Sequence, residues 1–197
     1  MDESEASPET ALAATHDRIL DGAARAVARH GLARLAMRDV GECAGVARGT
    51  VYRHFPNREA LLREMAQREA GRFLARWRDT MTGVPRAERL RVCFEYPARF
   101  ARENPLLQRL VETDPEFVLR TVREQYPLIA QSVGELLGPV IAETEIVRRG
   151  PVSVELLVDW TCRVLLSAFL VPVAEPERLA EGLDAIHRSL SSERQAR

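Results

Sequence analysis

The sequence contains no lysine, so all 28 of its basic residues are arginines. Its three cysteines lie far apart without a CxxC pair, which argues against a disulfide framework and suits a reducing compartment. The four histidines show no metal-ligand spacing, and neither a GxSxG elbow nor a phosphate-binding glycine loop is present. The sequence therefore predicts no catalytic residue, no metal site and no cofactor.

Long uninterrupted apolar runs are also missing. The most apolar stretch, residues 152–171, carries Glu155, Asp159 and Arg163 in its middle, which argues against a membrane helix. The first ten residues, MDESEASPET, are acidic rather than basic and then apolar, so they fit neither a signal peptide nor a transit peptide. We expect a cytoplasmic protein without a membrane partner, and a disordered acidic tail at residues 1–14.

The charge of the chain is unevenly distributed. Its 197 residues are 46% hydrophobic, enough for one large domain or two small ones, and its formal net charge is only -1. Residues 16–78, however, contain 13 arginines and 7 acidic residues, a local excess of +6. This basic block predicts a polyanionic partner for that part of the chain alone.

Apolar residues recur with helical spacing along most of the chain, and no segment alternates convincingly with period two. The pattern predicts an all-α fold of about nine helices, with glycine and proline pairs such as Gly138-Pro139 between them. The expected helices are 15–29, 37–44, a short helix ending near residue 55, 57–82, 86–103, 105–112, 115–137, 153–171 and 176–191.

The stretch AGVARGTVYRHF predicts a helix-turn-helix. On its second helix Val51 points inward together with Ala47 and Phe55, which leaves Gly49 facing outward. Gly45 can adopt the left-handed conformation that a tight turn between two crossed helices requires. The outward face offers arginine, threonine and tyrosine, which are suitable donors for base edges and phosphates.

The segments ILDGAARAVARHGL and MRDVGECAGVARGTVYRHFPNREALL closely resemble the DNA-binding domain of the TetR family of bacterial transcriptional regulators. The match runs from Ile19 to Leu62. The resemblance implies a DNA-binding domain at 15–62 with its motif at about 37–55, an effector-binding and dimerisation domain at 63–192, a linking helix at about 57–82 and a tail at 193–197.

The resemblance also assigns residues to the DNA interface. Positions equivalent to Tyr52, His54 and Arg58 usually contact phosphates in similar proteins, and the outward side of the second helix faces the major groove. Ala36 and Ala47 lack the hydroxyl that often caps these helices in the family, a contact worth about 1 kcal/mol. The DNA-binding residues that we expect are Arg38, Arg48, Gly49, Thr50, Tyr52, Arg53, His54 and Arg58.

The middle of the chain has features of a sensor. Pro97 and Pro127 fall inside expected helices, where each removes a hydrogen bond and kinks the helix, and kinks open space between packed helices. An ordinary core with helix breaks is the alternative. The resemblance implies an effector-binding site here, and the apolar character of the expected lining indicates a small hydrophobic or amphipathic effector. Arg99, Arg163 or Tyr126 would be its polar anchor. The expected lining is Phe94, Arg99, Phe100, Leu107, Phe117, Tyr126, Trp160, Arg163 and Leu166.

The last two expected helices have apolar surface for more than one neighbour. Glu155, Asp159 and Arg163 recur every four residues and form one narrow stripe, so the rest of that helix is available for burial. The final helix has one apolar seam, which in a monomer would face the core. The resemblance favours a homodimer joined by a four-helix bundle. The expected interface residues are Leu156, Val164, Leu179, Leu183, Ile186 and Leu190.

Together these features predict a ligand-responsive repressor that an effector releases from a palindromic DNA operator. Two alternatives remain open. A redox-responsive regulator using Cys93 or Cys162 would change its DNA affinity reversibly with peroxide. A ligand-free architectural DNA binder would lack a cavity.

Overall fold

The computed structural model describes residues 8–171, 175, 177–178, 180–182 and 185–186, and it contains no β-strand among them. The predicted all-α fold class is confirmed. The elements are α1 (Pro8–His30), α2 (Met37–Ala44), α3 (Arg48–His54), α4 (Arg58–Met81), the 3-10 helix η1 (Arg86–Glu88), α5 (Arg89–Glu103), α6 (Pro105–Thr113), α7 (Pro115–Ile141), α8 (Glu145–Arg148) and α9 (Val154–Leu170).

The chain divides into two compact units. The first comprises residues up to Glu69 together with Pro105–Thr121, and the second comprises Ala70–Asn104 and the residues from Val122 onward. This division differs from the expected boundary at residue 62, and it assigns residues 105–121 to the first unit. The reason is that α6 packs against α1.

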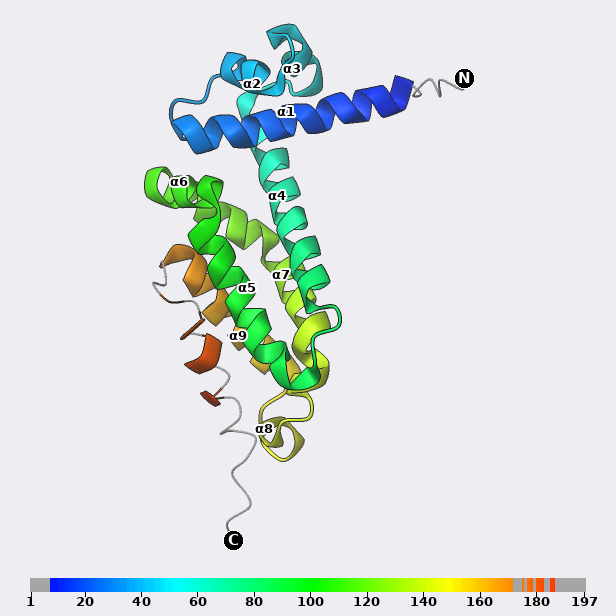
Figure 1. Cartoon of the computed structure of the whole chain (residues 1–197), viewed down its shortest axis with the longest axis vertical. Helices are drawn as coiled ribbons and strands as arrows, with labels where there is room; N and C mark the ends of the chain where they lie inside the picture. Colours follow the sequence, from blue (N-terminus) through cyan, green and yellow to red (C-terminus); the bar gives the residue numbers. More distant parts are fainter. Residues whose placement is uncertain (1–7, 172–174, 176, 179, 183–184, 187–197) are drawn as a thin grey trace. The chain divides into compact units, whose positions relative to one another are not determined.

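In the first unit, α2 and α3 lie on the same side of α1 (Figure 1). The buried face of α1 includes Ile19, Ala23 and Val27, each 0% exposed, as its apolar spacing predicts. Gly22 allows α1 and α2 to approach closely, because a Cβ atom there would lie 2.7 Å from Ala44 Cβ and 2.8 Å from the Ala44 nitrogen. The docking of α2 on α1 therefore depends on this glycine.

The first helix starts earlier than expected, at Pro8 instead of residue 15. Proline is tolerated in a first helical turn because its missing N–H would have no helical partner there. The alanines that follow favour helix, and Thr15 Oγ1 donates a hydrogen bond to the Ala11 carbonyl at 2.9 Å. Residues 8–14 are therefore helical and not a tail, while residues 1–7 and 193–197 lie outside the described part.

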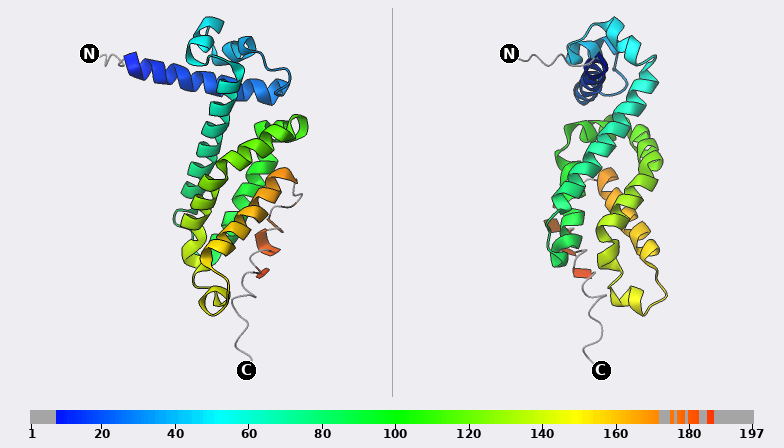
Figure 2. Two further views of the ribbon diagram at one scale, coloured as in Figure 1. Left: turned by 180° about the vertical axis from the view of Figure 1, so that it is seen from behind. Right: turned by 90° about the vertical axis from the view of Figure 1, so that its right-hand side faces the viewer.

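In the second unit, the later parts of α4 and α7 run alongside α5 and α9 as a helical bundle (Figure 2). Each of these four helices contributes to a single apolar core. In the described part of the chain, none of the helices is long and apolar enough to cross a membrane. The core consists of Leu74, Trp77, Met81, Leu90, Cys93, Phe94, Val133, Leu137, Ile141, Val158, Cys162, Leu165 and Ala180.

Prolines interrupt these helices less than their sequence positions suggest. Pro97 lies inside α5 and Pro127 inside α7, as predicted. The expected break at Gly138-Pro139 is wrong, because α7 continues to Ile141. Ile141 is only 2% exposed, and Arg86 Nη2 donates to the Pro139 carbonyl at 2.7 Å. Core burial and this contact hold the last turn in place.

Candidate nucleic-acid interface

Side chains of α1 donate hydrogen bonds to the turn between α2 and α3. Gly45 adopts the predicted left-handed conformation, with φ 67° and ψ 38°. Arg18 Nη2 donates to the carbonyls of Ala44 at 3.3 Å and Gly45 at 3.1 Å, and Arg25 Nη2 donates to the Cys43 carbonyl at 2.7 Å. These carbonyls form the negative end of α2, where cations are stabilising. Sequence reasoning missed both arginines, although their seven-residue spacing places them on one side of α1.

The buried residues of α3 determine which side of this helix faces outward. Val51 and Phe55 are buried, with 0% and 1% of their surface exposed, as predicted. Ala47 is exposed, so its expected burial is wrong. It precedes the helix as the N-cap in extended backbone, with φ -65° and ψ 148°, and helical angles therefore do not describe its direction.

The outward side of α3 presents hydrogen-bond donors around an open glycine. A Cβ atom at Gly49 would meet nothing within 4 Å. Arg53 Nη2 donates to Thr50 Oγ1 at 3.2 Å, and the Arg48 guanidinium lies 5.4 Å from the Tyr52 ring centroid. These contacts orient two cations on the exposed side of the helix.

An open groove of about 650 Å³ adjoins this surface, and the N-termini of α2 and α4 border it. Asn57 caps α4 as predicted, because its Oδ1 accepts the Ala60 N–H at 2.8 Å. The N-cap of α2, Ala36, has no side-chain cap, also as predicted. Helix N-termini attract anions, so the groove is suited to phosphate. Its lining is Leu35, Ala36, Met37, Arg38, Arg48, Tyr52, Pro56, Asn57 and Arg58.

Two arginines that line the groove, Arg38 and Arg58, differ in how far their side chains are exposed and bonded within the protein. The Arg38 side chain is 72% exposed, and its Nε lies 3.5 Å from Glu42 Oε1, a surface pair of little energetic weight. Arg58 is half-buried and donates to the carbonyl of Leu32, which ties the start of α4 to the segment after α1. Arg38 can reach a phosphate as it stands, whereas Arg58 already has an acceptor within the protein.

His54 at the end of α3 is half-buried and lies beside α1. Its ring centroid is 5.8 Å from that of His16, and His16 Nε2 lies 2.9 Å from Glu64 Oε1 on α4. The pKa of His54 is lowered, first by burial and then by His16 and Arg53. His54 therefore contacts neighbouring helices in addition to any role at the groove.

The nine residues expected to line an effector site fall in both compact units. Leu107 and Phe117 belong to the first unit, and the other seven belong to the second. Within the second unit Phe94 is buried, whereas Trp160 is 64% exposed, so the chain by itself does not enclose Trp160. The lining set stays a prediction.

Two of the expected polar anchors already bind the same carboxylate. Tyr126 Oη donates to Asp159 Oδ1, and Arg163 Nε donates to Asp159 Oδ2 at 2.8 Å. Burial, and then the bond to Asp159, raises the pKa of Tyr126 to about 12. This cluster connects α7 to α9.

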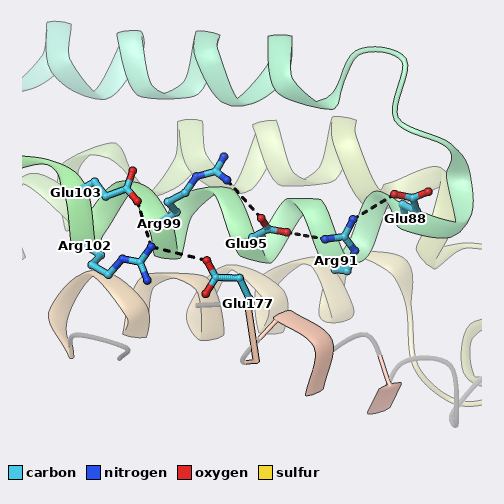
Figure 3. A network of polar contacts seen from close by, with 7 residues as sticks. All are labelled: Glu88, Arg91, Glu95, Arg99, Arg102, Glu103 and Glu177. Carbon is cyan, nitrogen blue, oxygen red and sulfur yellow. Dashed lines mark hydrogen bonds and ion pairs between the residues drawn. The ribbon is translucent and has the colours of Figure 1, made fainter. Parts of the chain in front are cut away.

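The third expected anchor, Arg99, belongs to a row of ion pairs along α5 (Figure 3). Its Nη1 lies 3.4 Å from Glu95 Oε1, and the other oxygen of Glu95 lies 2.7 Å from Arg91 Nη1. Arg91 also pairs with Glu88 at 3.2 Å. The positive charge of Arg99 is thus balanced within its own helix.

The expected dimer residues are only partly described. Leu156 and Ile186 are 57% and 56% exposed, and Val164 is half-buried. The remaining three lie outside the described residues: Leu179, Leu183 and Leu190. The interface therefore stays a prediction.

Burial acts against a thiol-based sensor. Cys93 and Cys162 are both 0% exposed. Burial raises the pKa of Cys93, and it raises the pKa of Cys162 to about 11. Because the thiolate is the reactive form, both cysteines are poorly placed to react with an oxidant.

Residues 19–65 match the model of the family described as bacterial regulatory proteins, tetR family. The uncharacterized HTH-type transcriptional regulator Rv1255c of Mycobacterium tuberculosis (strain ATCC 25618 / H37Rv) is 31% identical over 160 residues, which cover 79% of this chain and 75% of the relative. The HTH-type transcriptional repressor Rv1474c of the same strain is 28% identical over 187 residues, which cover 92% of this chain and 96% of the relative.

The fold also matches a solved structure, that of the TetR family repressor AlkX from Dietzia sp. strain DQ12-45-1b. The TM-score is 0.60 at 25% identity, and the match covers 89% of this chain and 94% of AlkX. The helix-turn-helix built around Gly45 lies within the residues that the family model matches. The chain therefore belongs to the tetR family of bacterial regulatory proteins and is a helix-turn-helix transcriptional regulator.

Proposed function

We propose that the protein is a homodimeric repressor in the bacterial cytoplasm, and that a small hydrophobic or amphipathic effector releases it from a near-palindromic operator. The observation that carries the DNA-binding part is the outward side of α3, where Gly49 faces open space between Arg48 and Arg53. The relatives named as repressors, Rv1474c and AlkX, support the direction of regulation.

In this proposal α3 enters the major groove. Gly49 allows the helix backbone to approach the base edges, and Thr50 with Arg53 supplies donors that can distinguish bases. Arg38, Arg48 and the N-terminus of α4 hold the phosphates on the side of the open groove. At the start of α2 the Ala36 N–H donates to Asp39 Oδ2 at 3.3 Å, so this end of the site contributes to phosphate binding through Arg38.

Two copies are required because one α3 reads only one half-site. The exposed apolar residues Leu156 and Ile186 support association through α9 and the helical segment that follows it. Symmetric half-sites then lie about one helical turn apart, so that each α3 meets a successive major groove. An effector lowers operator affinity to the extent that it binds the released form more tightly than the bound form.

Selection from a random duplex pool tests the proposal. The purified protein is expected to recover near-palindromic sequences, and sedimentation of the complex should show two chains on each such duplex. A small-molecule screen for release of that duplex then tests the effector. Recovery of asymmetric sequences by a single chain would overturn the proposal, and a failure of every compound class would overturn its ligand response.

A further inference from the structure

Trp77 carries a buried hydrogen-bond donor that the described part of the chain leaves without an acceptor. The residue lies in α4 and is 1% exposed, and its indole Nε1 has no partner there. Native proteins leave few buried donors unsatisfied, because such a group loses its bonds to water without replacement. The indole N–H therefore indicates an acceptor from outside the chain.

The surroundings of Trp77 restrict what that acceptor can belong to. The buried residues that pack with Trp77 in one core are hydrophobic. In the part of the chain that the structure describes, Ser132 and Thr144 are the buried polar residues, and no buried residue is charged. A charged group placed here would lose its hydration without an opposite charge to replace it. The molecule that meets Trp77 must be uncharged and largely apolar.

A row of aromatic rings leads away from Trp77. The Phe73 ring centroid lies 5.8 Å from that of Trp77, 5.6 Å from that of Tyr96 and 4.7 Å from that of Phe100. Phe73, Tyr96 and Phe100 are half-buried, so the row extends from the core toward the surface of α4 and α5. Aromatic rings favour offset or edge-to-face contact with another flat ring. The row suits a flat aromatic molecule.

The part of α5 that packs beside Trp77 lacks one of its backbone hydrogen bonds. Pro97 has no N–H to donate to the Cys93 carbonyl four residues earlier, and Cys93 packs in the same core as Trp77. A helix can deform more easily where a backbone bond is missing. α5 can therefore shift beside Trp77 with fewer bonds to break.

From these observations we propose that Trp77 anchors an uncharged, flat aromatic ligand through a hydrogen-bond acceptor on its ring, while the ring stacks along Phe73 and Phe100. The inference rests on the proposed function, in which the C-terminal half binds an effector, and it specifies the chemical class of that effector. Trp77 adds a donor to a site for which the sequence suggested only Arg99, Arg163 and Tyr126 as anchors.

Quinoline and naphthalene test this inference as a matched pair, because they share their shape and differ by one ring nitrogen that accepts a hydrogen bond. Equilibrium dialysis of the DNA-free protein at neutral pH gives the ratio of the Kd for quinoline to the Kd for naphthalene. Trp77→Phe keeps an aromatic ring but loses the N–H, so it should raise this ratio about three- to tenfold, because the ring nitrogen is then buried without a donor. An unchanged ratio in Trp77→Phe, or binding of neither compound to the wild type, would overturn the inference.

A second readout avoids any change at Trp77. The chain has two tryptophans, so a spectrum of 15N-labelled protein contains two indole N–H resonances, which Trp160→Phe assigns. Quinoline should move the Trp77 resonance downfield, and naphthalene should not. If saturating quinoline leaves the resonance in place, the bound compound does not use Trp77, and the inference is wrong even when Trp77→Phe fails to fold.

These measurements are independent of DNA. A protein that binds quinoline through Trp77 but keeps its operator with every compound would support this site and overturn the ligand response. If an effector releases the protein from its operator while the Trp77 resonance stays fixed, the ligand response is supported and the site at Trp77 is overturned.

Discussion

Arg53 donates a hydrogen bond to Thr50 Oγ1, one turn earlier on the outward side of α3, at 3.2 Å. The hydroxyl orients the guanidinium, so the two side chains act as one recognition unit. Arg53→Ala and Thr50→Ala should therefore alter base preference at the same position of the operator. Arg38→Ala, which removes an exposed cation outside α3, should weaken binding to all sequences alike. Sequence selection with the three variants compares these effects, and identical profiles for all three would contradict the assignment.

Two glycines of the first unit should respond in opposite ways to alanine. At Gly22 the new Cβ would lie 2.7 Å from Ala44 Cβ, so Gly22→Ala should destabilise the protein by about 1–3 kcal/mol. At Gly49 the new Cβ meets nothing within 4 Å, so Gly49→Ala should stabilise it by up to about 1 kcal/mol. Urea unfolding measures both changes. A loss of stability at Gly49 equal to that at Gly22 would show that α3 does not face outward.

Arg18 and Arg25 should affect DNA binding without touching DNA. Removing either one loses a hydrogen bond to the end of α2 and should cost about 1 kcal/mol of stability. Operator affinity should fall because α3 is less firmly placed, while the slope of log affinity against log salt stays unchanged. Arg48→Ala, which removes a groove cation, should reduce that slope. A reduced slope for Arg18→Ala would mean that Arg18 contacts phosphate.

The environment of His54 should make folding stability depend on pH. Its pKa in the folded protein is lowered from 6.5, chiefly by burial, so the unfolded chain binds a proton at higher pH than the folded chain does. Stability that is present above pH 6.5 is therefore lost as the pH falls toward the folded pKa. His54→Gln should reduce this loss relative to the wild type, as urea midpoints at pH 7.5 and 5.5 would show.

His16 provides the matched control. Because it lies beside His54 and its charge lowers the pKa of His54, His16→Gln should raise that pKa in an NMR titration. An unchanged His54 pKa in this variant would leave burial and Arg53 as the causes of the shift.

The proposed dimer can be tested on the described part of α9 and the helical segment after it. Leu156→Glu combined with Ile186→Glu would place two charges in an apolar interface, where an unpaired charge is costly. Sedimentation should show a monomer with weakened operator binding. Leu12→Glu is the control, because Leu12 is 62% exposed on α1 and should leave the dimer intact. A double variant that stays dimeric would exclude this interface.

Local chemistry explains which features could be predicted from the sequence. Apolar spacing located α2 and α3, Gly45 marked their turn, and Asn57 marked the start of α4, because each signal depends only on neighbouring residues. Ala47 departs from the prediction because it precedes the helix, where helical angles do not describe the direction of a side chain.

Contacts between distant segments could not be predicted in this way. Nothing in the sequence pairs Arg58 with the carbonyl of Leu32, 26 residues earlier, and backbone carbonyls carry no residue identity that a motif could reveal. The passage of α7 through Pro139 likewise depends on Arg86, a residue 53 positions away. The sequence does not indicate that the indole N–H of Trp77 is buried without an acceptor, because this depends on the residues that pack around it.

Titration of a selected near-palindromic duplex and a scrambled duplex of the same composition, at physiological salt, tests the central claim most directly. The account predicts that the protein binds the palindrome at least about a thousandfold more tightly, and that both affinities fall steeply with added salt as arginines displace phosphate counterions. Equal affinity for the two duplexes would contradict it.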